Sequence, residues 1–213
     1  MKPTIWAILL LACGLAFGQK LQDASANGSP LSLLVKNDHA EMGPYAAARN
    51  KSDKAILAMV AIVRATDEKG GVHPCHSYMD YTFKSGGVLA PKEERFASLI
   101  KPADAGAKVT SVDGAVLFVQ FDDGTIWGDP AAGEKLLAAR PQKLAFLQKL
   151  VETYYASGEG AFSALLNDGR LGSPEDMLAE CLKSDADYRK VPTIEMAKKL
   201  MAAAQSWRAL GIF

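Results

Sequence analysis

The chain has 213 residues, of which 49% are hydrophobic and 23% are charged, a composition typical of a globular protein that buries a core. Lys and Arg together number 24, as do Asp and Glu, so the formal net charge is zero. A surface that binds nucleic acid needs an excess of basic residues. We therefore expect no nucleic-acid partner.

The first residues, MKPTIWAILLLACGLAFGQK, have the parts of an export signal. Lys2 supplies the positive end, and residues 5–17 form an apolar run shorter than the roughly 20 residues that span a membrane. The small residues Ala16 and Gly18 predict cleavage before Gln19, so that residues 1–18 are a signal peptide. We expect no transmembrane helix in the mature chain.

A second interpretation of the same segment is lipid attachment. Leu10-Leu11-Ala12-Cys13 resembles a bacterial lipobox, which ends in a lipidated cysteine. The apolar run continues beyond Cys13, and this favours simple cleavage. Both interpretations place the protein outside the cytoplasm, in the periplasm or the extracellular space.

Residues 19–30 are polar and contain Gly-Ser-Pro, which predicts a flexible lead-in. Residues 31–128 then show the pattern of short strands. Turns are predicted at residues 67–71, at Asp113-Gly114 and at Asp123-Gly124, because Gly accepts a positive φ without steric cost. The predicted strands are residues 31–35, 45–49, 55–63, 78–83, 95–100, 108–112, 115–121 and 125–127. This many short strands predicts an antiparallel β-sandwich.

Residues 129–213 instead show apolar residues at spacings of three and four, which predicts helices. Ser173 followed by Pro174 is a typical helix start, and Gly158 and Gly211 are typical helix ends. The predicted helices are residues 141–157, 160–167, 173–184 and 193–211. The fold class expected for the whole chain is α+β, with an N-terminal β-sandwich followed by a C-terminal helical region.

Two segments carry a resemblance to known domains. Arg49-Asn50-Lys51-Ser52-Asp53-Lys54-Ala55-Ile56 resembles the N-x-S-x-x-x-I entry of Ig-like sandwich domains in exported bacterial proteins. Residues 119–128 (VQFDDGTIWG) resemble the closing hairpin of uncharacterised members of that group. The resemblance covers residues 31–128 and implies an Ig-like β-sandwich, but a shared fold of this kind implies no particular activity.

The stretch V-H-P-C-H-S at residues 72–77 contains the chain's best candidate metal ligands. His73, Cys75 and His76 carry the imidazole and thiolate groups that zinc and copper prefer. In an extended strand, His73 and Cys75 share a face while His76 points away, so a bent loop at Pro74 is needed to bring all three together. His39 or Asp80 could supply a further ligand.

Two of the three cysteines, Cys75 and Cys181, remain after removal of the signal peptide. A pair of cysteines in an exported protein predicts a disulfide, here one that ties the sandwich to the helical region. The alternatives left open are a metal site at Cys75 and two free thiols in a structural loop.

No G-x-S-x-G, G-x-x-x-x-G-K-[ST] or G-x-G-x-x-G motif occurs in the chain, and Asp122-Asp123 is better explained by a turn than by paired catalytic carboxylates. We therefore expect a non-catalytic binding or scaffolding protein without a cofactor, whose partner is another envelope or extracellular protein. One alternative is a zinc- or copper-binding protein that uses the loop of residues 73–76. Another is a hydrolase with a site at the junction of sandwich and helices.

Overall fold

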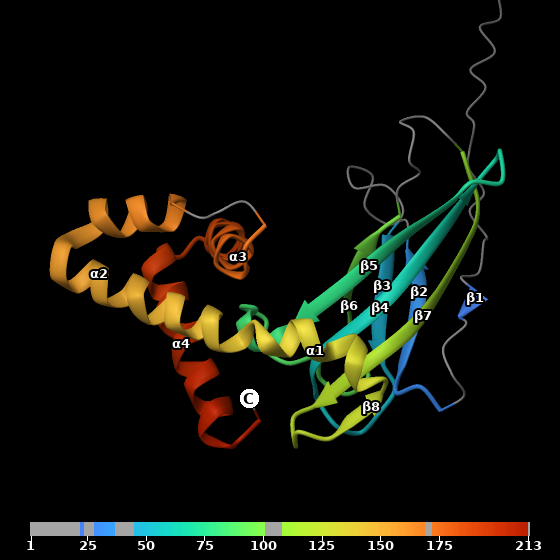
Figure 1. The fold of residues 1–213 in the computed structure, drawn as a ribbon, viewed down its shortest axis with the longest axis horizontal. Coiled ribbons are helices and arrows are strands. Elements are labelled where there is room, and N and C mark those ends of the chain that lie inside the picture. Colours follow the sequence, from blue (N-terminus) through green and yellow to red (C-terminus); the bar gives the residue numbers. More distant parts are fainter. Residues whose placement is uncertain (1–21, 24–27, 37–44, 101–107, 169–171, 213) are drawn as a thin grey trace, which may run out of the picture.

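The computed structural model describes residues 22–23, 28–36, 45–100, 108–168 and 172–212. It is a mixed α+β structure in which the strands precede the helices, as the sequence predicts (Figure 1). The described strands are β1 (Gln22–Asp23), β2 (Leu31–Lys36), β3 (Tyr45–Asn50), β4 (Ile56–Asp67), β5 (Val72–Asp80), β6 (Glu94–Leu99), β7 (Val109–Phe121) and β8 (Ile126–Gly128). The described helices are the short 3-10 helix η1 (Tyr81–Phe83), α1 (Pro130–Ala138), α2 (Arg140–Asn167), α3 (Pro174–Arg189) and α4 (Thr193–Ala209).

The strands form two sheets. The larger sheet has the order β1-β7-β4-β5, with β8 also paired with β7, and the smaller sheet has the order β2-β3-β6. All described pairs are antiparallel except β1, which lies parallel to β7. Gln22 and Asp23 therefore belong to the larger sheet, although the sequence predicts a flexible lead-in over residues 19–30.

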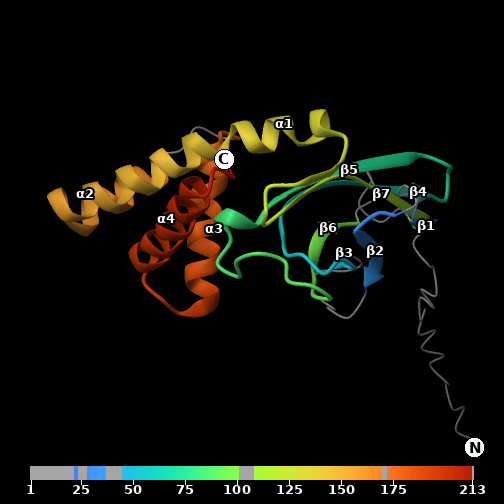
Figure 2. The same ribbon diagram turned by 90° about the horizontal axis from the view of Figure 1, so that it is seen from below.

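The two sheets pack around one apolar core. Alternate residues of β4 (Met59, Ala61 and Val63) are buried in it together with Leu31 and Leu33 of β2. This follows from the strand geometry, since every second side chain points to the same face. Figure 2 shows the larger sheet lying between the smaller sheet and α1.

The entry into β4 is shaped by Asn50, whose side chain is fully buried. Its amide nitrogen donates to the carbonyl oxygens of Lys54 (2.8 Å) and Leu89 (3.1 Å), and its amide oxygen accepts from the Ser52 N–H (2.9 Å) and hydroxyl (2.7 Å). Every polar group of this buried side chain is thus used. The N-x-S pattern before Ile56 therefore has a physical role, because it folds the turn that precedes β4.

Asp113 and Gly114 do not form the turn predicted from the sequence. β7 runs through both residues, so the two strands predicted on either side of them are one strand. At Gly114 a Cβ atom would lie 2.9 Å from Leu33 Cδ1 and 3.0 Å from the carbonyl oxygen of Ile62. A glycine is thus required here for close approach rather than for a turn.

The two other predicted turns are confirmed. Between β4 and β5, the Asp67 carboxylate accepts hydrogen bonds from the N–H groups of Lys69 (2.8 Å) and Gly71 (2.9 Å), and Gly70 has a φ of +81°. Between β7 and β8, Gly124 also has a φ of +81°. In both hairpins, a glycine takes the backbone conformation that other residues rarely adopt.

Helix α1 covers part of the outer face of the larger sheet and was not among the predicted helices. Asp129 caps its start by accepting a hydrogen bond from the Ala131 N–H (2.9 Å), with Pro130 in the first turn. Gly133 lies so close to the Phe118 ring that a Cβ atom would be 2.5 Å from it. Leu136 completes this contact, so the larger sheet is packed on both faces here.

Most helix boundaries in the helical region agree with those predicted from the sequence. Gly158 breaks α2 with a φ of +79°, which separates the two helices expected on either side of it. Ser173 caps α3, which extends to Arg189, beyond the predicted end at residue 184. The helices α2, α3 and α4 enclose a second apolar core. Residues 1–21, which contain the predicted signal peptide, and residues 37–44, which contain His39, lie outside the described residues.

Within the described part of the chain, none of the helices has both the length and the apolar character needed to cross a bilayer.

Candidate functional site at the junction of the two regions

The two cores meet at residues 80–88, which we call the junction segment. The strand predicted over residues 78–83 ends at Asp80, and η1 follows it. Asp80 Oδ1 ends the strand by accepting from the Thr82 N–H (3.3 Å) and hydroxyl (2.6 Å). In this tight turn Tyr81 enters the core between the sheets, whereas Phe83 enters the helical core. A continuous strand would have placed both rings on one face.

Asp80 also forms a buried ion pair with the first turn of α2. Arg140 donates from Nε to Oδ2 (3.1 Å) and from Nη2 to Oδ1 (3.2 Å), and the two side chains are 0% and 3% exposed. Lys143 Nζ lies 3.8 Å from Oδ2 of the same carboxylate. Burial lowers the pKa of Lys143, although the nearby Asp80 and Cys181 act in the opposite direction. The sequence signals no such pair, because its members are far apart in the chain.

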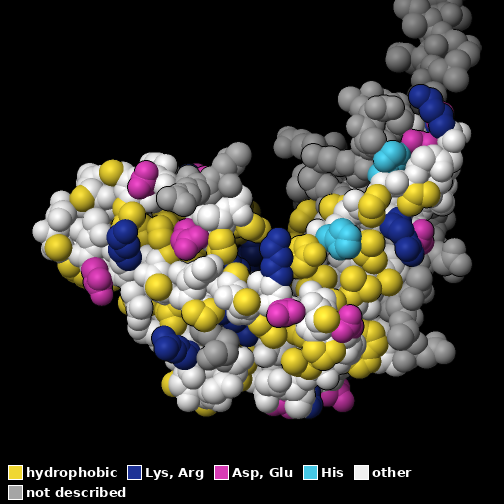
Figure 3. All heavy atoms as spheres, in the orientation of Figure 1, with side chains coloured by type: hydrophobic (Ala, Val, Ile, Leu, Met, Phe, Trp, Pro, Cys, Tyr) yellow, Lys and Arg dark blue, Asp and Glu magenta, His cyan; other side chains and the backbone are white. Residues whose placement is uncertain are grey.

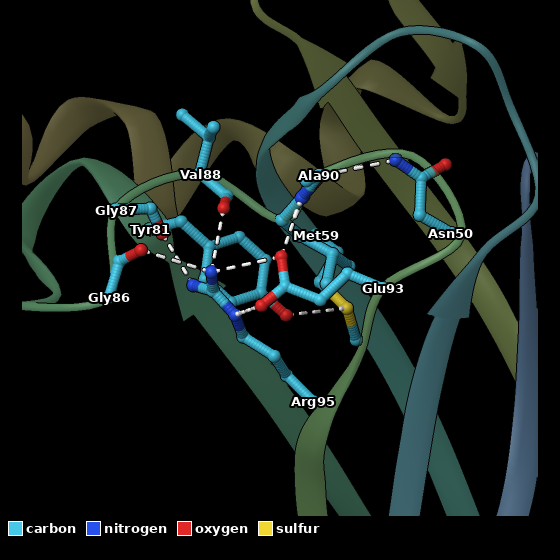
Figure 4. Close-up of polar contacts among 10 residues, drawn as sticks. Asn50, Met59, Tyr81, Gly86, Gly87, Val88, Ala90, Glu93 and Arg95 are labelled. Atoms are coloured by element: carbon cyan, nitrogen blue, oxygen red, sulfur yellow. Dashed lines mark hydrogen bonds and ion pairs between the residues drawn. The ribbon is translucent and has the colours of Figure 1, made fainter.

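Arg95 on β6 holds the other end of the junction segment (Figure 4). Its guanidinium donates to the carbonyl oxygens of Gly86 (3.0 Å), Gly87 (2.5 Å) and Val88 (2.8 Å). It also donates to both carboxylate oxygens of Glu93, at 2.7 and 3.0 Å. This arginine therefore fixes the loop in one conformation and has a structural role.

The groups around Arg95 have shifted acidities. Burial raises the pKa of Glu93, but hydrogen bonds from Arg95 and from the Ala90 N–H outweigh it, and the pKa is lowered overall. Burial raises the pKa of Tyr81, whose ring lies 5.4 Å from the Arg95 guanidinium. The Tyr81 hydroxyl contacts Met59 Sδ at 3.6 Å in the core. Neither group is poised to exchange protons near neutral pH.

One face of α3 packs against the junction segment. Cys181, Asp185 and Arg189 follow one another at intervals of four residues and therefore lie on one side of the helix. Lys84 Nζ lies 3.1 Å from Cys181 Sγ, and Asp185 accepts a hydrogen bond from the Ser85 N–H (3.1 Å). Arg189 Nε donates to the Ser85 hydroxyl (3.0 Å). These contacts fix two consecutive residues of the segment along two turns of α3.

Three cavities surround the junction segment, and Lys84 lines all of them. The largest, which we call the junction cleft, has a volume of about 700 Å³. A mostly apolar pocket of about 250 Å³ lies between the segment and α4, and a pocket of about 60 Å³, here the thiol pocket, reaches Cys181. The space-filling view is notched between the two regions, with Lys or Arg side chains at the notch and hydrophobic ones on the sheet side (Figure 3). The junction cleft is lined by Met79, Tyr81, Lys84, Ser85, Gly86, Glu93, Arg95, Phe96, Asp185, Tyr188 and Arg189.

The structure does not bring the predicted metal ligands together. Pro74 is accommodated within β5, an edge strand of the described sheet, so the strand stays regular through residues 72–80. His73 Nε2 lies 2.8 Å from Asp67 Oδ2, Cys75 Sγ accepts from the Ser98 hydroxyl (3.0 Å), and the His76 ring stacks on Tyr78. Among the residues that the structure places, no three His, Cys, Asp or Glu side chains form a group that could hold a metal ion.

The predicted disulfide is not formed in the structure either, since Cys75 and Cys181 are both free. Cys75 lies on β5 beside Ser98, whereas Cys181 lies on α3 beside Lys84. Cys181 lies at a contact between the two regions, but the residue it meets there is Lys84 and not Cys75.

Comparison of the chain with protein-family models, with curated proteins and with solved structures finds no match. The geometry of the junction is therefore the basis on which a function can be assigned.

Proposed function

We propose that this chain is an exported, non-catalytic binding protein whose junction cleft holds an extended segment of another protein. The observation that carries the proposal is the cleft itself, which is concave, has a volume of about 700 Å³ and is lined by both regions. Binding sites favour such positions between packed units. The export part rests on the apolar run of residues 5–17 and the small residues before Gln19.

The character of the lining favours a peptide. Phe96 is 41% exposed and Tyr188 is 86% exposed, so each lining region offers the cleft an aromatic side chain whose burial on binding would be favourable. Arg189 and Asp185 bring charges of both signs to the α3 side. Arg95 is engaged by Glu93 and by three carbonyl groups. Such a mixed lining suits a peptide better than a polyanion.

The likeness to Ig-like domains is part of the same proposal. It is supported by two packed sheets that share one core, and by the ordered turn that Asn50 and Ser52 form before β4. Sandwiches of this kind serve many roles, so this likeness adds a scaffold to the proposal and no activity.

A site-specific photocrosslinker tests the binding site. We expect a crosslinking amino acid in place of Tyr188 to capture one partner from the native envelope. The matched control is Tyr155, which is 69% exposed but lies on α2 outside the junction cleft. The adduct at position 188 should decrease by about tenfold when Phe96→Ala removes an aromatic contact. Equal capture from positions 188 and 155, or none from either, would refute the proposal.

The intact mass of the protein from an export-competent host tests the location. Cleavage before Gln19 and lipid attachment at Cys13 give very different masses, and an unprocessed chain would contradict export.

A further inference from the structure

Lys84 lines the junction cleft, but its contact with Cys181 has no part in the proposed binding function. Lys84 Nζ lies 3.1 Å from Cys181 Sγ, although the two residues are 97 positions apart in the chain. Lys84 directly follows η1, which carries side chains into both cores, and Cys181 lies in the middle of α3. An amine and a thiol at this distance are placed for bond formation once the sulfur is oxidised.

The approach of the two groups is fixed by their neighbours as well as by their own contact. Ser85, the residue after Lys84, is held by Asp185 at 3.1 Å and by Arg189 at 3.0 Å. These residues lie one and two turns after Cys181 on the same face of α3. The geometry of the pair therefore does not depend on the Lys84 side chain alone.

The thiol pocket gives a small oxidant access to the pair. Its volume is about 60 Å³, and Lys84, Lys143 and Cys181 all line it. A water molecule occupies roughly 30 Å³ in the liquid, so the pocket can take a molecule as small as hydrogen peroxide. Tyr78 and Met177 also line the pocket and are 46% and 56% exposed, so it opens to solvent. A large reagent would not enter as readily.

We propose that Lys84 and Cys181 form a covalent sulfur–nitrogen bond in response to hydroperoxides. In the first step the Cys181 sulfur attacks the peroxide, an S–O bond forms and the O–O bond breaks. The sulfur loses two electrons to hydrogen peroxide and keeps one of its oxygens as a sulfenic acid, while the other oxygen takes up the thiol proton and leaves as water. In the second step the Lys84 ammonium group first loses one proton to solvent. The free amine then attacks the sulfur, an S–N bond replaces the S–O bond, and the sulfenic oxygen leaves as water with a second proton from the nitrogen.

The bond would join the junction segment to α3 and so link the two regions covalently. Cys75 supplies the contrast within the same molecule, because its sulfur meets the Ser98 hydroxyl instead of an amine. Oxidation of Cys75 would therefore produce no sulfur–nitrogen bond to Ser98, the residue that its sulfur contacts. The proposal goes beyond the binding function, and its readout does not depend on any partner.

Peptide mapping of the oxidised protein tests the link. The background is the full chain with Cys75→Ser, which removes any disulfide with Cys181. After treatment with hydrogen peroxide, we expect a crosslinked peptide pair that contains positions 84 and 181 and is two hydrogens lighter than the sum of its parts. A thiol reductant should restore the separate peptides.

Lys84→Arg is the matched control, because arginine keeps the positive charge but is not deprotonated in proteins and offers no free amine. In this variant, the link should fall by more than about tenfold, while dimedone traps the Cys181 sulfenic acid. Lys143→Arg should leave the link intact. The proposal is overturned if no link to position 84 forms, if the link survives Lys84→Arg, or if it involves Lys143 instead.

Discussion

The two-sheet region and the helical region complete their cores differently. In the two-sheet region, every buried member of the core comes from the strands or from the segments between them. The helical core includes Phe83, which belongs to the segment that leaves the sheets. The change of sequence pattern near residue 128 therefore marks a change of secondary structure. It does not mark the limit of the helical core, because Phe83 precedes it and packs in that core. This difference predicts that the stability of the helical region depends on the two-sheet region more than the stability of the two-sheet region depends on the helices.

The largest effect is expected from Asp80→Ala, which tests whether the two regions are coupled. The substitution leaves the guanidinium of Arg140 buried beside the nearby Lys143, without its carboxylate partner at Asp80. Removing one member of a buried ion pair typically costs about 3–5 kcal/mol, and we expect a loss of this size in the free energy of unfolding. Urea denaturation followed by fluorescence and by circular dichroism measures it.

The control for this prediction is a pair on the surface. Glu180 contacts Lys183 one turn away on α3 and is 67% exposed in its side chain, so Glu180→Ala should cost no more than about 0.5 kcal/mol. If Asp80→Ala is as mild as Glu180→Ala, the ion pair does not couple the regions. If the helices melt first in Asp80→Ala, the asymmetry between the regions is confirmed.

A medium effect within the helical region alone is expected from Gly158→Ala. Gly158 has φ +79° and ψ −177°, a conformation that is largely restricted to glycine, and a Cβ atom there would meet no other atom within 4 Å. The cost of about 1–3 kcal/mol should therefore be conformational. Thermal unfolding measures it, with Gly160→Ala as control.

Gly160 lies two residues further along α2, has no positive φ and has open space around it. There alanine should stabilise the helix by about 0.5–1 kcal/mol. The same sign for both substitutions would mean that Gly158 does not set the break in α2.

The smallest effect concerns the tip of the β4–β5 hairpin in the two-sheet region. The hydrogen bond from His73 and the N–H of Gly71 lower the pKa of Asp67 below its usual value of 3.8. Because the folded-state pKa is lowered, the contribution to stability is present above about pH 4 and is lost as the pH falls through the lowered value. Asp67→Asn should remove this dependence.

Thermal unfolding between pH 7 and pH 3 gives the measurement for Asp67. The difference in stability between wild type and Asp67→Asn should shrink as the pH falls. A difference that stays constant over this range would show that ionisation of Asp67 does not contribute to the stability of the folded state.

Local signals made much of the fold predictable. Ser173 with Pro174, and the glycines at 124, 158 and 211, act through backbone conformation and capping within a few residues. The same kind of signal, Asp129 followed by Pro130, precedes α1 and could have identified that helix. Asp113-Gly114 gives a wrong turn prediction because glycine is needed both in turns and where two segments of a chain approach closely. Only the packing of Leu33 against Gly114 distinguishes the two cases.

The candidate site was much less predictable, because its contacts join distant parts of the chain. Asp80 meets Arg140, and Lys84 meets Cys181, through packing of η1 between the two regions. Neither pair has a spacing that sequence periodicity can detect. The chemical types of Cys75 and His76 suggest metal ligands, but the alternation along a regular strand sends the two side chains to opposite faces.

The position of Asp80 has a consequence for the order in which the chain folds as it is made. Synthesis proceeds from the N-terminus, so Asp80 emerges 60 residues before Arg140, the arginine that neutralises it. Until residue 140 is available, burial of this carboxylate is unfavourable, and the end of β5 stays solvated. The turn after β5 therefore closes only when α2 arrives, which makes docking of α2 the step that completes the junction between the two regions.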